Sequence, residues 1–501
     1  MKHLIKSIIT AGFLSTLGFS CSDSFTESDA IGKIDVVDYL KTDDHAESAL
    51  YGVYDLMQWN YNRPWFSAFF IKVLPGDESN AGWANSDEPD YHKIDDYKYE
   101  ASNPKFQGIW DGYYLTIGAA NNIIVNLAKT DLASKDLIIA EAKALRAFNY
   151  FELVTLFGEV PLRLINPLTA NDDFSLPKST KAQVYAQIEK DLNDAIAILP
   201  EKGKTKYKFR ISKEGAQAVL GKALLYQEKW SAAHQTFEKI IQSGRLGLEE
   251  NYEDVWSRKS EHGKESLLEL SYVTTQKNDW GNFKWGGRPE SNIHVQLMGP
   301  RNVDKSPGFQ NVESIGLVNG WGFNIPTAKI AEAFILEKDT IRKNASVISE
   351  ADALAKGVKL VGSLDDYEKY IRLKYVTRSS ETSNVGVDAL NYGINWRLIR
   401  YADVLLMAAE AFHKDGKDDK ALVELNKVRK RVKLPAVTAT GTALFEAIVK
   451  ERQLELAFEG QRFWDLVRWG KAASTLGSKY SVANNTFPIP ISEMQLNPAI
   501  K

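Results

Sequence analysis

The chain has 501 residues, of which 44% are hydrophobic, so it holds enough apolar material for a large buried core. Its 62 basic and 65 acidic residues give a formal net charge of −3, and no block of basic residues stands out. This balance excludes nucleic acid as an expected partner. The seven histidines lie singly and there is one cysteine, so we expect no cofactor and no metal site built from those ligands. The sequence does not exclude a calcium site built from carboxylates alone.

The first twenty residues have the pattern of an export signal. Lys2 and Lys6 precede a mostly apolar stretch that ends at residue 20, and Cys21 follows directly. The stretch is shorter than the roughly 20 apolar residues that a permanent membrane helix needs. It resembles a bacterial lipoprotein signal, which implies that Cys21 is acylated and becomes the first residue. The alternative is an ordinary secretory signal with a buried cysteine nearby.

Residues 21–43 are polar and acidic without sustained periodicity, which is typical of a tether. From there to residue 501 we expect a single domain. Apolar residues recur in it at spacings of three and four, which predicts helices. The ranges with this pattern are 46–58, 109–129, 137–157, 180–199, 213–244 and 401–431.

The last two of these ranges have the pattern of helical hairpins. In 213–244 and again in 401–431, small residues on one helix face large residues on the other, at close to the 34-residue length of tetratricopeptide units. The fold class predicted is therefore mainly α, a tetratricopeptide-like helical hairpin scaffold. A few short strands are expected beside it, including one within 265–273.

Two long segments, about 60–104 and 274–326, lack helical periodicity and are rich in glycine, polar residues and aromatics. We interpret them as loop insertions, and long loops in a compact domain are usually functional or disordered. A sugar presents a flat patch of C–H groups with a rim of hydroxyls, so its receptor needs aromatic faces beside polar groups. The loops offer such candidates: Asp77, Asn80, Trp83, Trp280, Phe283, Trp285, Arg288 and Trp321. For each tryptophan, the alternative is packing within its own loop.

Residues 451–470 stand out near the end of the chain. Their spacing predicts a helix interrupted at Gly460, with an apolar face and an exposed charged face on which neighbours pair. Glu455 and Glu459 lie one helical turn apart, and glycoside hydrolysis uses two carboxylates. Arg452 and Arg462 close by favour surface ion pairs over catalysis. No serine-hydrolase elbow, phosphate loop or dinucleotide motif is present, so we expect a protein that is not an enzyme.

The same stretch, Glu-Arg-Gln-Leu-Glu-Leu-Ala-Phe-Glu-Gly-Gln-Arg-Phe-Trp-Asp-Leu-Val-Arg-Trp-Gly, resembles the C-terminal signature of the SusD/RagB family. Residues 146–162 and 396–411 resemble two further elements of that family. The resemblance implies a glycan-binding lipoprotein held in the outer membrane of Bacteroidetes by its lipid anchor and facing the exterior. It also implies a SusC-like TonB-dependent transporter as the partner that receives the cargo.

Two other hypotheses stay open at this point. The helical face could serve as a protein-interaction scaffold of the uptake complex without affinity for glycans. A surface glycoside hydrolase is the third hypothesis. The sequence does not say which glycan is bound, or whether the cargo is a peptide instead.

Overall fold

The computed structural model describes residues 39–63, 65–82, 86–166, 175–283, 288–301 and 307–500. Its longer helices are α3 (Asp43–Asn62), α6 (Pro104–Leu127), α7 (Lys135–Phe157), α8 (Lys181–Ile196), α9 (Lys213–Tyr226), α10 (Trp230–Gln242), α15 (Tyr401–Lys414), α16 (Asp418–Arg431) and α17 (Gly441–Glu455). Its shorter helices are α4 (Ala68–Val73), α5 (Pro89–Asp95), α11 (Ile293–Met298), α12 (Ala328–Leu336), α13 (Thr340–Ser346), α14 (Glu350–Ala355), α18 (Arg462–Arg468), α19 (Ala472–Leu476) and α20 (Ile491–Leu496).

The strands of the described residues are short and pair two by two, always antiparallel. The pairs are β1 (Ser79–Gly82) with β4 (Phe323–Pro326), β2 (Ser266–Leu270) with β8 (Trp396–Arg400), β3 (Gly308–Gln310) with β6 (Lys359–Val361), and β5 (Val347–Ser349) with β7 (Tyr370–Arg372). Each pair joins segments that are distant in sequence.

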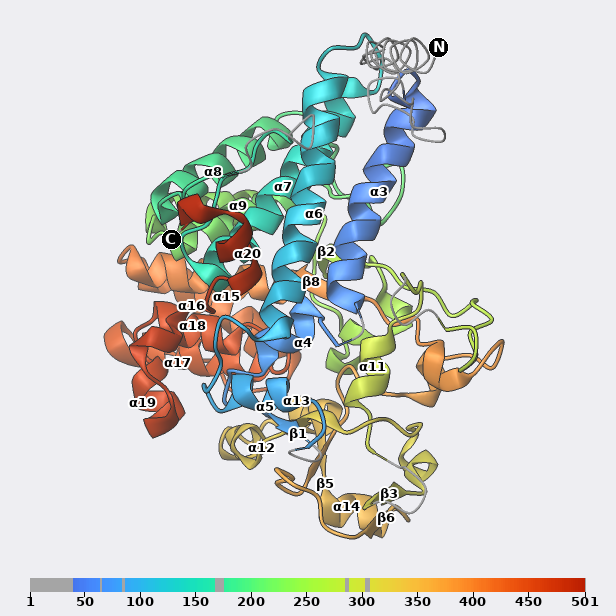
Figure 1. Cartoon of the computed structure of the whole chain (residues 1–501). Helices are drawn as coiled ribbons and strands as arrows, with labels where there is room; N and C mark the ends of the chain where they lie inside the picture. Colours follow the sequence, from blue (N-terminus) through green and yellow to red (C-terminus); the bar gives the residue numbers. More distant parts are fainter. Residues whose placement is uncertain are drawn as a thin grey trace, which may run out of the picture.

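The long helices form a continuous array in which each packs on the next. Helices α3, α6 and α7 lie side by side, α8, α9 and α10 follow, and α15, α16 and α17 complete the row (Figure 1). The predicted helical hairpins are present as α9 with α10 and α15 with α16. The mainly helical, tetratricopeptide-like scaffold is thus confirmed. No helix within the described ranges is both long enough and apolar enough to cross a membrane.

Local sequence explains where the array's helices begin and end. Thr180 caps α8 through its hydroxyl, and Gln183 returns a bond to the Thr180 backbone, which is a capping box. The Ser212 hydroxyl caps α9 by accepting from the amide of Gly215. Helix α7 ends at Gly158, whose φ of +79° favours glycine. These signals fix the lengths of the scaffold helices.

The segment 60–104 is more ordered than its prediction as a loop. It contains α4, α5 and β1, and all six residues of α4 are buried. Helix α4 has only six residues, five of them apolar, so its sequence is too short to show a helical period. The expectation of a long irregular loop was therefore wrong for this part of the chain.

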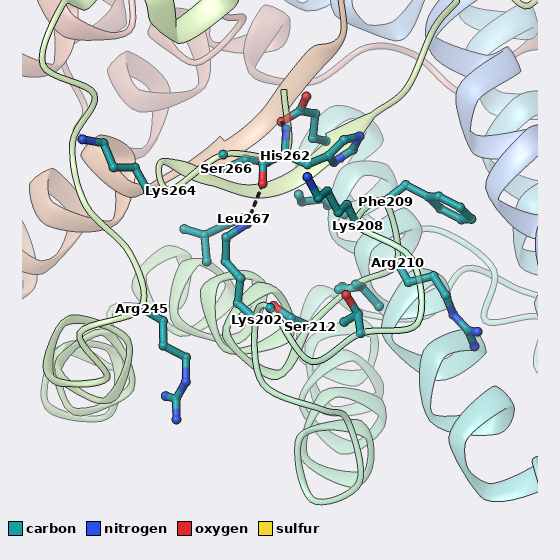
Figure 2. A pocket seen from close by; sticks show the side chains of 16 residues that line it. Lys202, Lys208, Phe209, Arg210, Ser212, Arg245, His262, Lys264, Ser266 and Leu267 are labelled. Carbon is teal, nitrogen blue, oxygen red and sulfur yellow. Dashed lines mark hydrogen bonds between the residues drawn. The ribbon is translucent and has the colours of Figure 1, made fainter. Parts of the chain in front are cut away.

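The strand expected within 265–273 is β2, whose five residues are all buried. The connection from α8 to α9 crosses beside β2 and encloses a cavity of about 370 Å³ with it (Figure 2). Phe209 anchors this connection to α3 by edge contacts with Tyr51 and Tyr54, at ring-centre distances of 6.1 and 5.3 Å. The cavity thus lies between the helical array and the strand pair.

Candidate functional site

Three tryptophan rings from separate loops lie in a near-parallel row. The ring centres of Trp65 and Trp321 are 5.5 Å apart with 16° between their planes, and those of Trp321 and Trp280 are 6.4 Å apart with 24° between the planes. Trp280 is 52% exposed, whereas Trp65 and Trp321 are half-buried. We call these three residues the tryptophan row. It offers apolar ring surface to solvent at its Trp280 end and is supported by packing at its Trp65 end.

Trp321 is held by a tight backbone crossing. Its amide donates to the carbonyl of Gln296 over 3.0 Å, and the amide of Gly320 donates to Pro300 over 2.7 Å. A Cβ on Gly320 would lie only 2.3 Å from the Cα of Gly299, so the two chain segments cross where only glycine fits. The position of the Trp321 ring is thus set by the backbone beneath it.

Trp65 lies in the short turn between α3 and α4, with a φ of +67°. This left-handed conformation costs a tryptophan about 1–3 kcal/mol and tends to occur at functional sites. Phe323 of β4 meets the Trp65 ring edge-on, at 5.9 Å between ring centres. Trp65 was not among the predicted site residues.

Trp280 is carried by a compact turn. The Asp279 carboxylate accepts from the amides of Gly281 and Asn282, over 2.7 and 2.9 Å. The amide of Phe283 closes the turn by donating to the Asp279 carbonyl, and the Phe283 ring is buried against Ile293. The structure therefore assigns Phe283, a predicted ligand contact, the place of a buried anchor beneath the exposed Trp280.

The polar candidates are all engaged in contacts within the protein. Arg288 forms an ion pair with Asp55, and its guanidinium lies 5.7 Å from the ring centre of Trp59. The Arg288 side chain is half-exposed. The Asn80 amide donates to the carbonyl of Asp366 over 2.9 Å and to the Glu368 carboxylate over 2.8 Å. Both side chains are thus held by partners outside the tryptophan row.

Asp77 is a buried ion-pair partner. Its carboxylate lies 2.8 Å from Arg462 and 2.9 Å from Lys329. Burial raises its pKa, but the two cations outweigh burial and hold the pKa below its usual range. This ties the first loop segment to the C-terminal stretch. Three further predicted residues, Trp83, Trp285 and Cys21, lie outside the described residues.

The stretch 451–470 differs from its prediction. Helix α17 ends at Glu455, the chain turns through Phe458 and Gly460 with φ of +64° and +71°, and α18 begins at Arg462. The charges expected on an exposed face are buried: Glu455 is fully covered and Glu459 is 7% exposed. The predicted exposed charged face is thus wrong, because spacing shows which residues share a face but not what packs on it.

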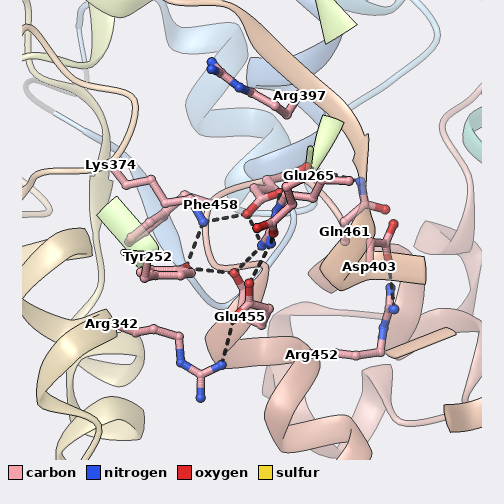
Figure 3. A network of polar contacts seen from close by, with 12 residues as sticks. Tyr252, Glu265, Arg342, Lys374, Arg397, Asp403, Arg452, Glu455, Phe458 and Gln461 are labelled. Carbon is pink, nitrogen blue, oxygen red and sulfur yellow. Dashed lines mark hydrogen bonds and ion pairs between the residues drawn. The ribbon is translucent and has the colours of Figure 1, made fainter. Parts of the chain in front are cut away.

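The partners of these carboxylates come from elsewhere in the chain (Figure 3). Arg400 of β8 lies 2.6 Å from Glu455, 2.8 Å from Glu459 and 2.9 Å from Glu265. Lys374 adds a contact of 2.6 Å to Glu459. Burial raises the pKa of Glu455, but the surrounding arginines outweigh burial and hold the pKa well below its usual range. A carboxylate held ionised in this way is not a proton donor for glycoside hydrolysis.

Metal ligands do not gather in the part of the chain that is described. No group of three or more His, Cys, Asp or Glu side chains there is arranged to hold a metal ion. The calcium site that the sequence left open stays a prediction.

Comparisons with known proteins agree with this architecture. Residues 362–486 match the SusD family, and residues 50–225 match a family described as starch-binding and associating with the outer membrane. A SusD-like protein of Bacteroides ovatus is 25% identical over 94% of this chain and 83% of its own length. SusD-like protein P38 of Formosa agariphila is 27% identical over 95% of this chain and 94% of its own length.

Among solved structures, a laminarin-binding SusD-like protein superposes with a TM-score of 0.82. It is 31% identical, and the match covers 91% of this chain and 98% of that one. The surface glycan-binding protein A of Bacteroides thetaiotaomicron in complex with laminarihexaose, at 23% identity and a TM-score of 0.77, shares the fold. With this extent of similarity in sequence and structure, the chain belongs to the SusD family.

Proposed function

We propose that this protein binds a glycan on the tryptophan row, without catalysis. The observation that carries the proposal is the row itself: three near-parallel rings from separate loops, with the outermost half-exposed. Sugar rings stack on such aromatic faces through their C–H groups. The backbone crossing below Trp321 supports this role, because a preorganised ring loses little entropy on binding.

The proposed ligand class is a β-glucan of the laminarin type. The solved relative at 31% identity is named as laminarin-binding, which makes this polysaccharide the first to test. The hydrolase hypothesis assigned catalysis to Glu455 and Glu459. Both carboxylates are buried in ion pairs, and this supports capture over cleavage.

Localisation and handover form the second part of the proposal. A lipid on Cys21 would anchor the protein in the outer membrane, facing the exterior, and a SusC-like TonB-dependent transporter would receive the glycan. The family resemblance supports this, as does the match of residues 50–225 to a family described as associating with the outer membrane.

A binding screen of protein lacking residues 1–21 tests the proposal. Native gels cast with laminarin, starch, xylan, mannan or host glycans are compared with a gel without polysaccharide, and incubated glycans are analysed for shortening. We expect retardation by laminarin without any change in its length. Retardation by none of the polysaccharides would overturn glycan capture and favour the interaction scaffold, while shortened products would favour the hydrolase.

A further inference from the structure

The cavity between β2 and the α8–α9 connection has more basic than acidic residues in its lining. Five of its lining side chains are lysine or arginine, namely Lys202, Lys208, Arg210, Arg245 and Lys264. The lining includes one carboxylate among the described residues, Glu269. No residue of the tryptophan row lines this cavity, so it is a separate feature of the molecule.

Three of the five cations already have acidic partners. Arg210 lies 2.6 Å from Glu141, Arg245 lies 2.6 Å from Glu201, and Lys264 lies 3.9 Å from Glu249. In Figure 2 the charged ends of these three side chains point away from the centre of the ring of lining residues. They shape the wall of the cavity but do not supply its charge.

The other two cations, the half-buried Lys202 and the exposed Lys208, form no ion pair with a described residue. Lys202 donates to the carbonyl of His262 over 3.5 Å, and it has no carboxylate within ion-pair distance among the described residues. Lys208 has neither a hydrogen bond nor an ion pair with any described residue. Both side chains extend toward β2 inside the ring of lining residues (Figure 2).

The positive charge of Lys208 acts unfavourably on the ammonium group of Lys202. Burial lowers the pKa of Lys202, Glu269 and Glu214 oppose this effect, and the smaller effect of Lys208 lowers the pKa further. Glu269 does not pair with either lysine, since it accepts from Asn395 over 2.7 Å and from the amide of His262 over 3.0 Å. An anion placed between the lysines would remove this repulsion.

We propose that this cavity binds an oxyanion, the carboxylate or sulfate group of an acidic ligand, between the ammonium groups of Lys202 and Lys208. The hydroxyl of Thr205, which also lines the cavity, supplies a neutral donor to the same group. Lysine holds such anions as a point charge, so the site accepts carboxylate and sulfate alike. The site is independent of the glycan capture proposed for the tryptophan row.

Calorimetric titrations at low ionic strength test this site with three probes: sodium sulfate, glucuronic acid and glucose 6-sulfate. The variant is K202A/K208A, and the matched control is K204A/K229A. The control removes the same two charges from exposed lysines that do not line the cavity but pair with Glu201 and Glu189. Thermal melts confirm that both variants are folded.

We expect the wild type and the control to bind at least one probe, with a loss of about tenfold or more in K202A/K208A, since a hydrogen bond to a charged group contributes about that factor. Equal affinity for sulfate and for the two sugars would identify the anion alone as the ligand. Tighter binding of the sugars would identify an acidic saccharide. Absence of binding by the wild type, or an equal loss in both variants, would overturn the proposal. Laminarin retardation of K202A/K208A, measured in parallel, reports separately on the tryptophan row.

Discussion

Arg400 connects the C-terminal signature with the middle of the chain. It is 1% exposed, and its guanidinium bridges Glu265, next to β2, with Glu455 and Glu459 of the stretch 451–470. A buried charge network of this kind costs desolvation, but each member depends on the others once it is formed. Removing one cation therefore leaves the carboxylates partly uncompensated in a dry environment.

We predict that R400M lowers the free energy of unfolding by about 3–5 kcal/mol, as breaking a buried ion pair does. Urea unfolding followed by far-ultraviolet circular dichroism measures this. The control is K190A, which removes an exposed ion pair of α8 with Asp194 and should change the unfolding free energy by no more than about 0.5 kcal/mol. Equal, small effects of both substitutions would contradict a structural role for the buried network.

Glu78, next to Asp77, is a buried carboxylate whose pKa is raised, whereas the pKa of Glu455 is lowered. It is 1% exposed, and one oxygen accepts from the amide of Phe458 over 3.0 Å, while the other has no partner among the described residues. Burial and the neighbouring charge of Asp77 raise the pKa of Glu78 to about 8. Folding therefore takes up a proton, and the stability linked to Glu78 is full below pH 4.5 and is lost as the pH rises toward 8.

Replacing this carboxyl with a neutral amide should remove that loss. We predict that the unfolding free energy of E78Q, relative to wild type, rises by about 1–3 kcal/mol between pH 5 and pH 8. Urea titrations at the two pH values give the difference, with E332Q on the exposed side of α12 as the control. A difference between E78Q and wild type that is the same at both pH values would show that Glu78 does not take up a proton on folding.

At the scale of elements, close helix packing brings the end of α3, and with it the turn of Trp65, against α6. A Cβ on Gly112 of α6 would lie 2.0 Å from the side-chain oxygen of Asn60, and one on Gly108 would lie 2.4 Å from the ring of Phe66. Phe66 follows Trp65 directly in the chain. The glycines of α6 thus set the distance at which the Trp65 turn is held.

We predict that G112A destabilises the protein by about 1–3 kcal/mol, because the added methyl group forces α3 and α6 apart. Gly52 of α3 provides a matched control, since nothing lies within 4 Å of its Cβ position. G52A should stabilise the protein by about 0.5–1 kcal/mol through helix propensity. Thermal denaturation of both variants checks the pair, and a stable G112A would contradict the close contact.

Sequence periodicity predicted the long helices of the array, both α3 and α8 with a polar face and α7 and α9, which are buried along most of their length. It failed in short segments and for the partners of charged residues. Helix α4 has only six residues, and the charges of 455–462 lie opposite Arg400 and Lys374, which are distant in sequence. A local pattern does not contain these long-range partners, so the buried network was not predictable.

At the scale of the whole molecule, the helical array carries loops that are distant in the sequence but lie together in the structure. Trp65, Trp280 and Trp321 converge because β1 pairs with β4, and the segment between β2 and α11 folds back onto the end of α3. The sequence predicted Trp280 and Trp321 as site candidates because they are aromatic residues in glycine-rich segments. Trp65 was not among the predicted residues, because its position in a strained turn appears only in the backbone geometry.

The most direct test of glycan capture on the tryptophan row is a calorimetric titration of laminarin oligosaccharides into wild type, W280A, W321A and W230A. Trp230 lies at the start of α10 and serves as the control for replacing a partly buried tryptophan. We predict a loss of affinity of about tenfold or more for W280A and W321A, because each removes ring surface from the sugar, and none for W230A. Unchanged affinity in both W280A and W321A would show that the glycan binds elsewhere.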